Sequence, residues 1–263
     1  QAIFGDLWRY VNPWSGPYTL LRQMGVTPSA QLPSRLGYWP GALSFLAFAA
    51  VLLAHPAPSV PVQLAVMVST YWLFHFVGML VYGPRWLRRA EGLSILLACY
   101  ASIAVFGTRR GHLSAGLWGW KTLCRPAPPI SLALFCVTIL AIGSFDGLNE
   151  TFWWFGKIGV NPLEYPGRSA VVSETLMGIL IAVPALIAAY AFSVWLGVRL
   201  IHQKRAFALA VCALAPAILP IALGYHIGHY LPSFLVEIQY VARSFCSNSG
   251  LCEVQVTTGF FKT

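Results

Sequence analysis

The sequence predicts an all-α integral membrane protein. Hydrophobic residues make up 57% of the 263 residues and charged residues only 10%, against roughly 25% charged in a soluble globular domain. The apolar residues are also gathered into stretches close to the length of a helix that crosses a bilayer, about 20 residues for about 30 Å of hydrocarbon. Composition and patterning together exclude a soluble globular domain.

Six apolar stretches follow one another along the chain. Most approach the length of a full span, but the third is short and is expected to re-enter the membrane or to lie in the interface, which leaves about five transmembrane helices. Six spans are the alternative. The stretches cover residues 38–54, 62–82, 91–106, 128–146, 174–198 and 206–230.

Three regions are expected. Prolines recur in residues 1–37 and exclude a long helix there, and rings such as Trp14 and Tyr18 suit the headgroup layer, so this region is predicted to be an interfacial lead-in. Residues 38–245 are predicted to form the polytopic helical membrane domain, and residues 246–263 an extracytoplasmic tail.

The basic residues predict the orientation. The net charge is +9, but Lys and Arg sit in short loops between apolar stretches, where they act as topology signals and contact anionic lipid headgroups, so no nucleic-acid partner is predicted. With five spans, most Lys and Arg fall on one side. The positive-inside rule then places the N-terminus on the cytoplasmic side of the membrane and the C-terminus on the outside.

The cysteines near the C-terminus agree with this orientation. Cys246 and Cys252 bracket a short polar loop on the side that the charges assign to the outside. An oxidising compartment permits a disulfide between them.

Ionisable residues collect on the predicted outer face and suggest a metal site. His226 and His229 are three residues apart, on one face of a helix. With the carboxylate of Asp146, they form a donor set for a divalent transition metal. Asp146 and Glu174 are the candidate catalytic residues. The alternatives are interfacial-belt histidines and, for Asp146-Gly147, a helix-terminating turn.

His75 is a separate candidate for cofactor binding. It lies in the middle of an apolar stretch and among aromatic residues, and ionisable residues at membrane depth are functional-site hypotheses. The alternative is a histidine that is hydrogen-bonded to a backbone or hydroxyl group of another helix.

Several short motifs resemble one family. Asn12-Pro13-Trp14, the run 32–40, Val81-Tyr82-Gly83, Phe145-Asp146-Gly147 and Tyr225-His226 through His229-Tyr230 with Gln239 are similar to polytopic bacterial membrane proteins known as fenitrothion hydrolases. The resemblance covers about residues 5–242 and implies phosphotriester hydrolysis. It also implies a bacterial inner membrane, so that the predicted orientation makes the N-terminus cytoplasmic and the C-terminus periplasmic. The matching polar positions are Asn12, Asp146, His226, His229 and Gln239. Family members usually carry further helices before the Asn-Pro-Trp segment and a different C-terminal segment.

Two classes of function follow. The first is a subunit or accessory protein of a larger membrane complex, because 14% of the residues are aromatic and suit packing against other membrane chains. The second is a metal-dependent membrane hydrolase of apolar phosphotriesters, or a metal-handling or transport protein, because a bound ion can acidify a water or polarise a phosphoryl oxygen. Membrane lipids are expected partners in both.

Overall fold

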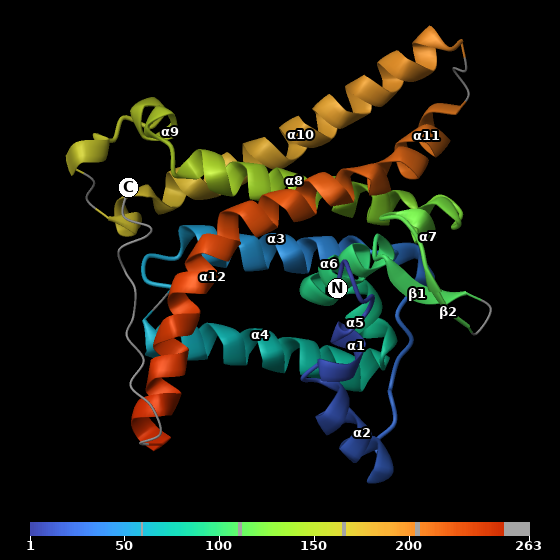
Figure 1. Ribbon diagram of the computed structural model, residues 1–263, viewed down its shortest axis with the longest axis horizontal. Coiled ribbons are helices and arrows are strands. Elements are labelled where there is room, and N and C mark those ends of the chain that lie inside the picture. Colours follow the sequence, from blue (N-terminus) through green and yellow to red (C-terminus); the bar gives the residue numbers. More distant parts are fainter. Residues whose placement is uncertain (59, 110–111, 165–166, 203–205, 250–263) are drawn as a thin grey trace. The chain divides into compact units, whose positions relative to one another are not determined.

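The computed structural model describes residues 1–58, 60–109, 112–164, 167–202 and 206–249 (Figure 1). These residues are mostly helical, and four helical segments among them are long and apolar enough to cross a membrane. The predicted all-α, membrane-embedded class is therefore confirmed. The four segments are Pro61–Tyr82, Ile130–Asn149, Arg168–Leu200 and Phe207–Val241.

Contacts divide the chain into two compact units, Gln1–Pro220 and Ile221–Thr263. Each unit is described by itself. The first unit contains every element up to the start of the last helix, and the second contains the rest of that helix.

The helices of the first unit match most of the predicted stretches. α4 (Pro61–Tyr82) has full length, but α3 (Trp39–Ala54) has 16 residues and extends only about 24 Å at 1.5 Å per residue. α6 (Gly92–Ser102) has 11 residues and extends about 16 Å, well short of the hydrocarbon thickness. The short helix expected at 91–106 is thus present, and α3 is shorter than a full span.

The N-terminal region is folded against α4. It contains α1 (Trp8–Val11), α2 (Ser15–Gln23) and the short η1 (Ser34–Leu36). Trp14 and Tyr18 are buried with Met79 and Leu87, and the Trp14 indole Nε1–H donates to the Trp72 carbonyl at 2.8 Å. The two rings are packed inside the protein, because α4 offers apolar surface to both and a backbone acceptor to Trp14.

A small β hairpin, absent from the prediction, follows α6. β1 (Phe106–Arg109) pairs antiparallel with β2 (His112–Ala115), after the short α5 (Arg85–Arg89) and before α7 (Trp120–Leu123). The Trp120 indole Nε1–H donates to the Val105 carbonyl at 2.9 Å. This bond ties α7 back to the strand that follows α6.

α8 (Ile130–Asn149) forms the centre of the first unit. It packs against α3, α10 and α11, and most of its residues are buried. The adjacent α9 (Phe152–Lys157), η2 (Pro162–Glu164) and η3 (Arg168–Val171) lead into α10 (Val172–Leu200), which runs through Pro184 without a break. Figure 1 shows α8 and α10 running side by side.

The last predicted stretch is longer and more divided than expected. It consists of α11 (Phe207–Leu214), the 3-10 turn η5 (Ala215–Ile218) and α12 (Leu219–Ser249). Pro216 lies in η5 and lacks the N–H that an α-helix needs there, which explains the change of helix type. α12 continues to Ser249, so the first residues of the predicted tail, 246–249, are helical. Cys252 and the side chain of Cys246 lie outside the described residues, as does their predicted disulfide.

Candidate functional site

A chain of hydrogen-bonded side chains, some buried and some half-buried, joins several elements of the first unit. Tyr71 and His75 lie one turn apart on α4, with ring centroids 4.5 Å apart. Glu91 is the N-cap of α6 and accepts hydrogen bonds from the backbone N–H groups of Leu93 at 2.8 Å and Ser94 at 2.6 Å. His75 is 1% exposed and Glu91 0%, so both ionisable groups are removed from solvent and need protein partners.

The groups involved determine which one donates and which one accepts in each of these hydrogen bonds. The Trp86 indole can only donate, so His75 Nδ1 is the acceptor of their 3.1 Å bond and the ring proton sits on Nε2. His75 Nε2 then donates to Ser44 Oγ at 3.0 Å. Ser44 also accepts from the backbone of α6, so its own proton points on to Tyr71, 3.5 Å away. Tyr71 donates to Glu91. The order is therefore Trp86, His75, Ser44, Tyr71, Glu91.

The two ring nitrogens of His75 are both used by this chain. Trp86 donates to Nδ1, and Ser44 accepts from Nε2. A metal or haem would have to displace one of these partners. The arrangement matches the hydrogen-bonded alternative for His75 instead of the cofactor ligand that its position suggested.

Sequence reasoning did not select Glu91 or Ser44. A signal for Glu91 was available, because an acidic residue directly before a short apolar helix is a candidate N-cap. No comparable signal exists for Ser44. It lies on α3, 47 positions before Glu91 in the sequence, and joins the hydrogen-bonded chain only through tertiary packing.

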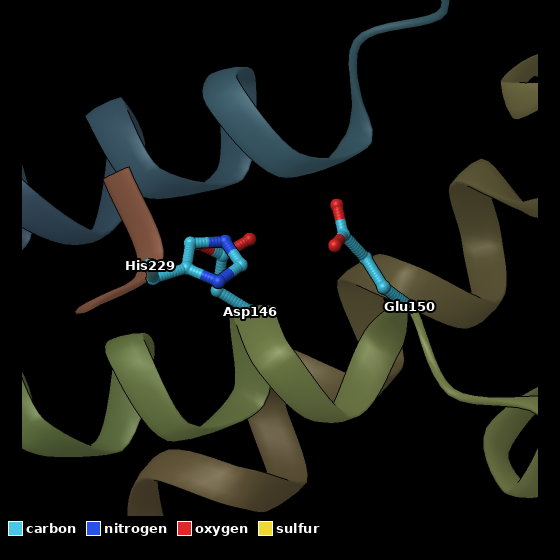
Figure 2. A group of neighbouring side chains, drawn as sticks. All are labelled: Asp146, Glu150 and His229. Carbon is cyan, nitrogen blue, oxygen red and sulfur yellow. The ribbon is translucent and has the colours of Figure 1, made fainter. Parts of the chain in front are cut away.

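Two carboxylates lie at the end of α8. Asp146 is buried and Glu150 is exposed, and Figure 2 shows both projecting from the same side of the helix. Their spacing of four residues explains this shared side. α8 continues through Gly147 to Asn149, so the alternative of a helix-terminating turn at Asp146-Gly147 is wrong. The helix keeps Asp146 one turn below Glu150, where the two oxygen donors suit a hard or borderline cation.

Glu174 lies in the first turn of α10. Its carboxylate accepts a hydrogen bond from the neighbouring Ser173 hydroxyl at 2.8 Å. The next residue, Thr175, donates to the Asn149 amide oxygen of α8 at 3.3 Å. Glu174 therefore begins a helix that is tied to the end of α8, and the helix dipole favours its negative charge.

The imidazoles of α12 belong to the second unit and form a ladder with tyrosines. Tyr225 and His229 stack at a centroid distance of 5.4 Å, and the rings of His226 and Tyr230 are 5.7 Å apart. His226 Nδ1–H donates to the Ala222 carbonyl at 2.8 Å, which assigns the lone pair to Nε2. A backbone carbonyl that accepts from the second ring nitrogen is also the usual orienting partner of a metal-binding histidine.

Asn12 and Gln239 are the other two polar positions that match the family motifs. Asn12 lies in the first unit and Gln239 in the second. Asn12 closes a local turn, since its side-chain oxygen accepts from the Trp14 N–H at 3.1 Å, and its amide donates to Ser94 Oγ at 3.4 Å. Gln239 donates to the Leu235 carbonyl one turn back on α12 at 3.0 Å.

Within each unit, the structure brings Asp146 close to Glu150 and places His226 one turn from His229. Comparisons with protein-family models, with curated proteins and with solved structures find no match to this chain.

Proposed function

We propose that this chain is a multi-pass protein of a bacterial inner membrane, N-terminus cytoplasmic and C-terminus periplasmic, that serves as a subunit or accessory protein of a larger membrane complex. The supporting observation is the first half of α4. Residues 61–70 are exposed on almost every face, whereas the second half of the same helix buries His75, Gly78 and Met79.

The side chains of this half-helix favour a protein neighbour over lipid alone. Gln63, Ser69 and Thr70 are all exposed between apolar residues. Polar side chains in hydrocarbon lose their water partners, and small or polar residues are enriched where membrane helices pack together. A second membrane chain with polar or small residues on its facing helix would cover this surface.

Photo-crosslinking in native membranes tests the proposal. A crosslinking residue at Val66, which is 60% exposed, is compared with one at Val77, which is 49% exposed on the packed half of the same helix. We expect Val66 to give a discrete cross-linked protein band and Val77 to give none. A result in which both positions give only lipid adducts would contradict a partner on this face.

A second candidate is a metal-dependent membrane hydrolase of apolar phosphotriesters, or a metal-handling protein. The observation that favours it is the pair Asp146 and Glu150, two carboxylates one turn apart on the central helix. We propose that this pair supplies oxygen ligands to a divalent transition metal. From the sequence, His226 and His229 remain the predicted nitrogen donors, and Glu174 remains a candidate base. The metal would supply an acidified water or polarise a phosphoryl oxygen.

A measurement of bound metal tests this second candidate function. The purified full chain is incubated with Zn²⁺, Mn²⁺ or Fe²⁺ in turn, desalted and analysed for bound metal. The same is done for Asp146→Asn/Glu150→Gln and for His226→Ala/His229→Ala, with Glu164→Gln as a control for unspecific carboxylate binding. We expect about one ion per chain in the parent and the control, and a loss in both double variants. Equal metal in all four proteins would rule out the site.

A further inference from the structure

A large cavity in the first unit is not used by either proposed function. It has a volume of about 1120 Å³, above the roughly 300–1,000 Å³ of typical small-molecule sites. Its walls come from α1, α5, α6, α8 and the segment from α11 through η5. α1 and α5 both pack against α6, and these three helices gather near the N-terminus in Figure 1.

The inner walls of this cavity are apolar. Ile95 and Cys99 line it from α6, Cys136 from α8 and Leu219 from the start of α12. All four side chains are buried. A small hydrated anion would leave this apolar surface uncovered, whereas hydrocarbon chains would fill it.

Three exposed arginines form the cationic rim of the same cavity. Arg9, Arg88 and Arg125 come from α1, α5 and the segment after α7, and all three side chains are exposed. Asp6 is the one carboxylate among the described lining residues. The guanidinium is planar and donates paired hydrogen bonds to phosphate oxygens. The positive field also extends to Lys121, where partial burial and then the charge of Arg125 lower the pKa of the ammonium group.

A serine hydroxyl also lines the cavity. Ser94 lines the cavity and accepts hydrogen bonds from the Trp8 indole N–H at 2.9 Å and the Asn12 amide at 3.4 Å. With both lone pairs engaged, the Ser94 hydroxyl proton is the group that it can offer to a further acceptor.

We propose that this cavity binds one anionic phospholipid. The phosphate lies among Arg9, Arg88 and Arg125, the ester oxygens lie at the level of Ser94, and the acyl chains follow the apolar walls. The charge of the rim selects an anionic headgroup, and the size and apolarity of the walls select a lipid over free phosphate. The three arginines are also among those that the positive-inside rule assigns to the cytoplasmic leaflet.

Native mass spectrometry of the full chain tests this site. The protein is titrated with phosphatidylglycerol and, separately, with phosphatidylcholine of the same acyl chains. We expect a single phosphatidylglycerol to bind with at least about tenfold higher affinity than phosphatidylcholine, because both lipids offer a phosphate but only phosphatidylcholine brings a quaternary ammonium cation next to the three arginines. Equal affinities for the two lipids, with many copies bound, would mean unspecific annular lipid and would overturn the proposal.

Matched variants locate the lipid. Arg88→Gln/Arg125→Gln removes two rim charges, and Arg35→Gln/Arg85→Gln removes two exposed charges outside the cavity. We expect the first double variant to bind phosphatidylglycerol about tenfold or more weakly and the second to bind it like the parent protein. An equal loss in both would show a response to net charge alone and would contradict the site.

Two further experiments test the lipid site without the arginine variants. Ala98→Phe places a ring in the cavity, and Ala47→Phe places one on an exposed face of α3 that does not line it. Only Ala98→Phe is expected to weaken phosphatidylglycerol binding. Inorganic phosphate at the same concentration is expected not to displace the lipid from the parent protein. Displacement by phosphate, or an equal effect of the two Phe variants, would assign the rim to small anions and overturn lipid binding.

Discussion

At the scale of single residues, Glu91 is the most constrained polar group of the first unit. Its two carboxylate oxygens accept three hydrogen bonds, from the Tyr71 hydroxyl and from the backbone N–H groups of Leu93 and Ser94. All three partners are donors, as a carboxylate requires. One side chain therefore caps a helix and also ends the polar chain that begins at Trp86.

Replacement of Glu91 is expected to destabilise the fold. Glu91→Ala leaves two N–H groups and the Tyr71 hydroxyl without their acceptor in a buried site, so we expect the free energy of unfolding to fall by at least about 2 kcal/mol. Glu91→Gln keeps one acceptor oxygen but turns an N–H donor toward a donor, and should give an intermediate loss. SDS titration in mixed micelles measures both variants. The exposed Glu237→Ala is the control, and a loss as large in this control would argue against the capping role.

Residues that are close in the sequence could be grouped in advance, whereas residues joined by packing could not. His226 and His229 could be selected because their spacing of three residues is visible in the sequence, and Asp146 because it ends an apolar stretch. The chain of Ser44, His75 and Glu91 was not found, since it is created by packing between helices that are distant in sequence. For the same reason, the partners that occupy both nitrogens of His75 could not be predicted from its aromatic neighbours.

At the scale of elements, long apolar stretches were predicted well and short ones poorly. α4, α8 and α10 lie close to their predicted ranges because each holds enough consecutive apolar residues to define a helix by composition alone. The β hairpin at 106–115 has no such run. The extension of α12 to Ser249 was missed because polar residues after Tyr230 resemble a membrane boundary, although they do not stop a helix.

The close approach of α3 and α6 depends on a glycine. A Cβ atom added at Gly92 would lie 2.7 Å from the backbone N and 2.8 Å from the Cα of Phe45. Backbone atoms cannot move aside as a flexible side chain can, so Gly92→Ala must push the two helices apart.

We expect Gly92→Ala to lower the free energy of unfolding by about 1–3 kcal/mol, the range for overpacked cores. Gly197→Ala is the matched control on α10, where no atom lies within 4 Å of an added Cβ, and it should be neutral or slightly stabilising by helix propensity. SDS titration or thermal unfolding compares the two. Equal effects would show that the contact with Phe45 is not limiting.

At the scale of the whole chain, the distribution of burial differs from that of a soluble protein. In the first unit, α8 is buried over 61% of its most apolar window, whereas α4 and α10 are each buried over 17%. The outer helices thus present apolar side chains outward, as expected where lipid is the solvent. Hydropathy alone could not rank these helices, since all of them are similarly apolar. Only packing shows which one is central.

Because of this difference in burial, truncation of an apolar side chain should cost much more stability on α8 than on α10. Ile139 on α8 is 0% exposed, and Leu180 on α10 is 66% exposed. Lipid is as apolar as a protein core, so burial itself contributes little between membrane helices and the lost packing contacts decide the outcome. Ile139→Ala should therefore lower the free energy of unfolding by about 1–3 kcal/mol through the cavity that it leaves. Leu180→Ala, which exchanges one lipid contact for another, should change it by less than about 0.5 kcal/mol. Unfolding of both variants in lipid bicelles measures the difference, and a loss for Leu180→Ala as large as that for Ile139→Ala would contradict the lipid-facing position of Leu180.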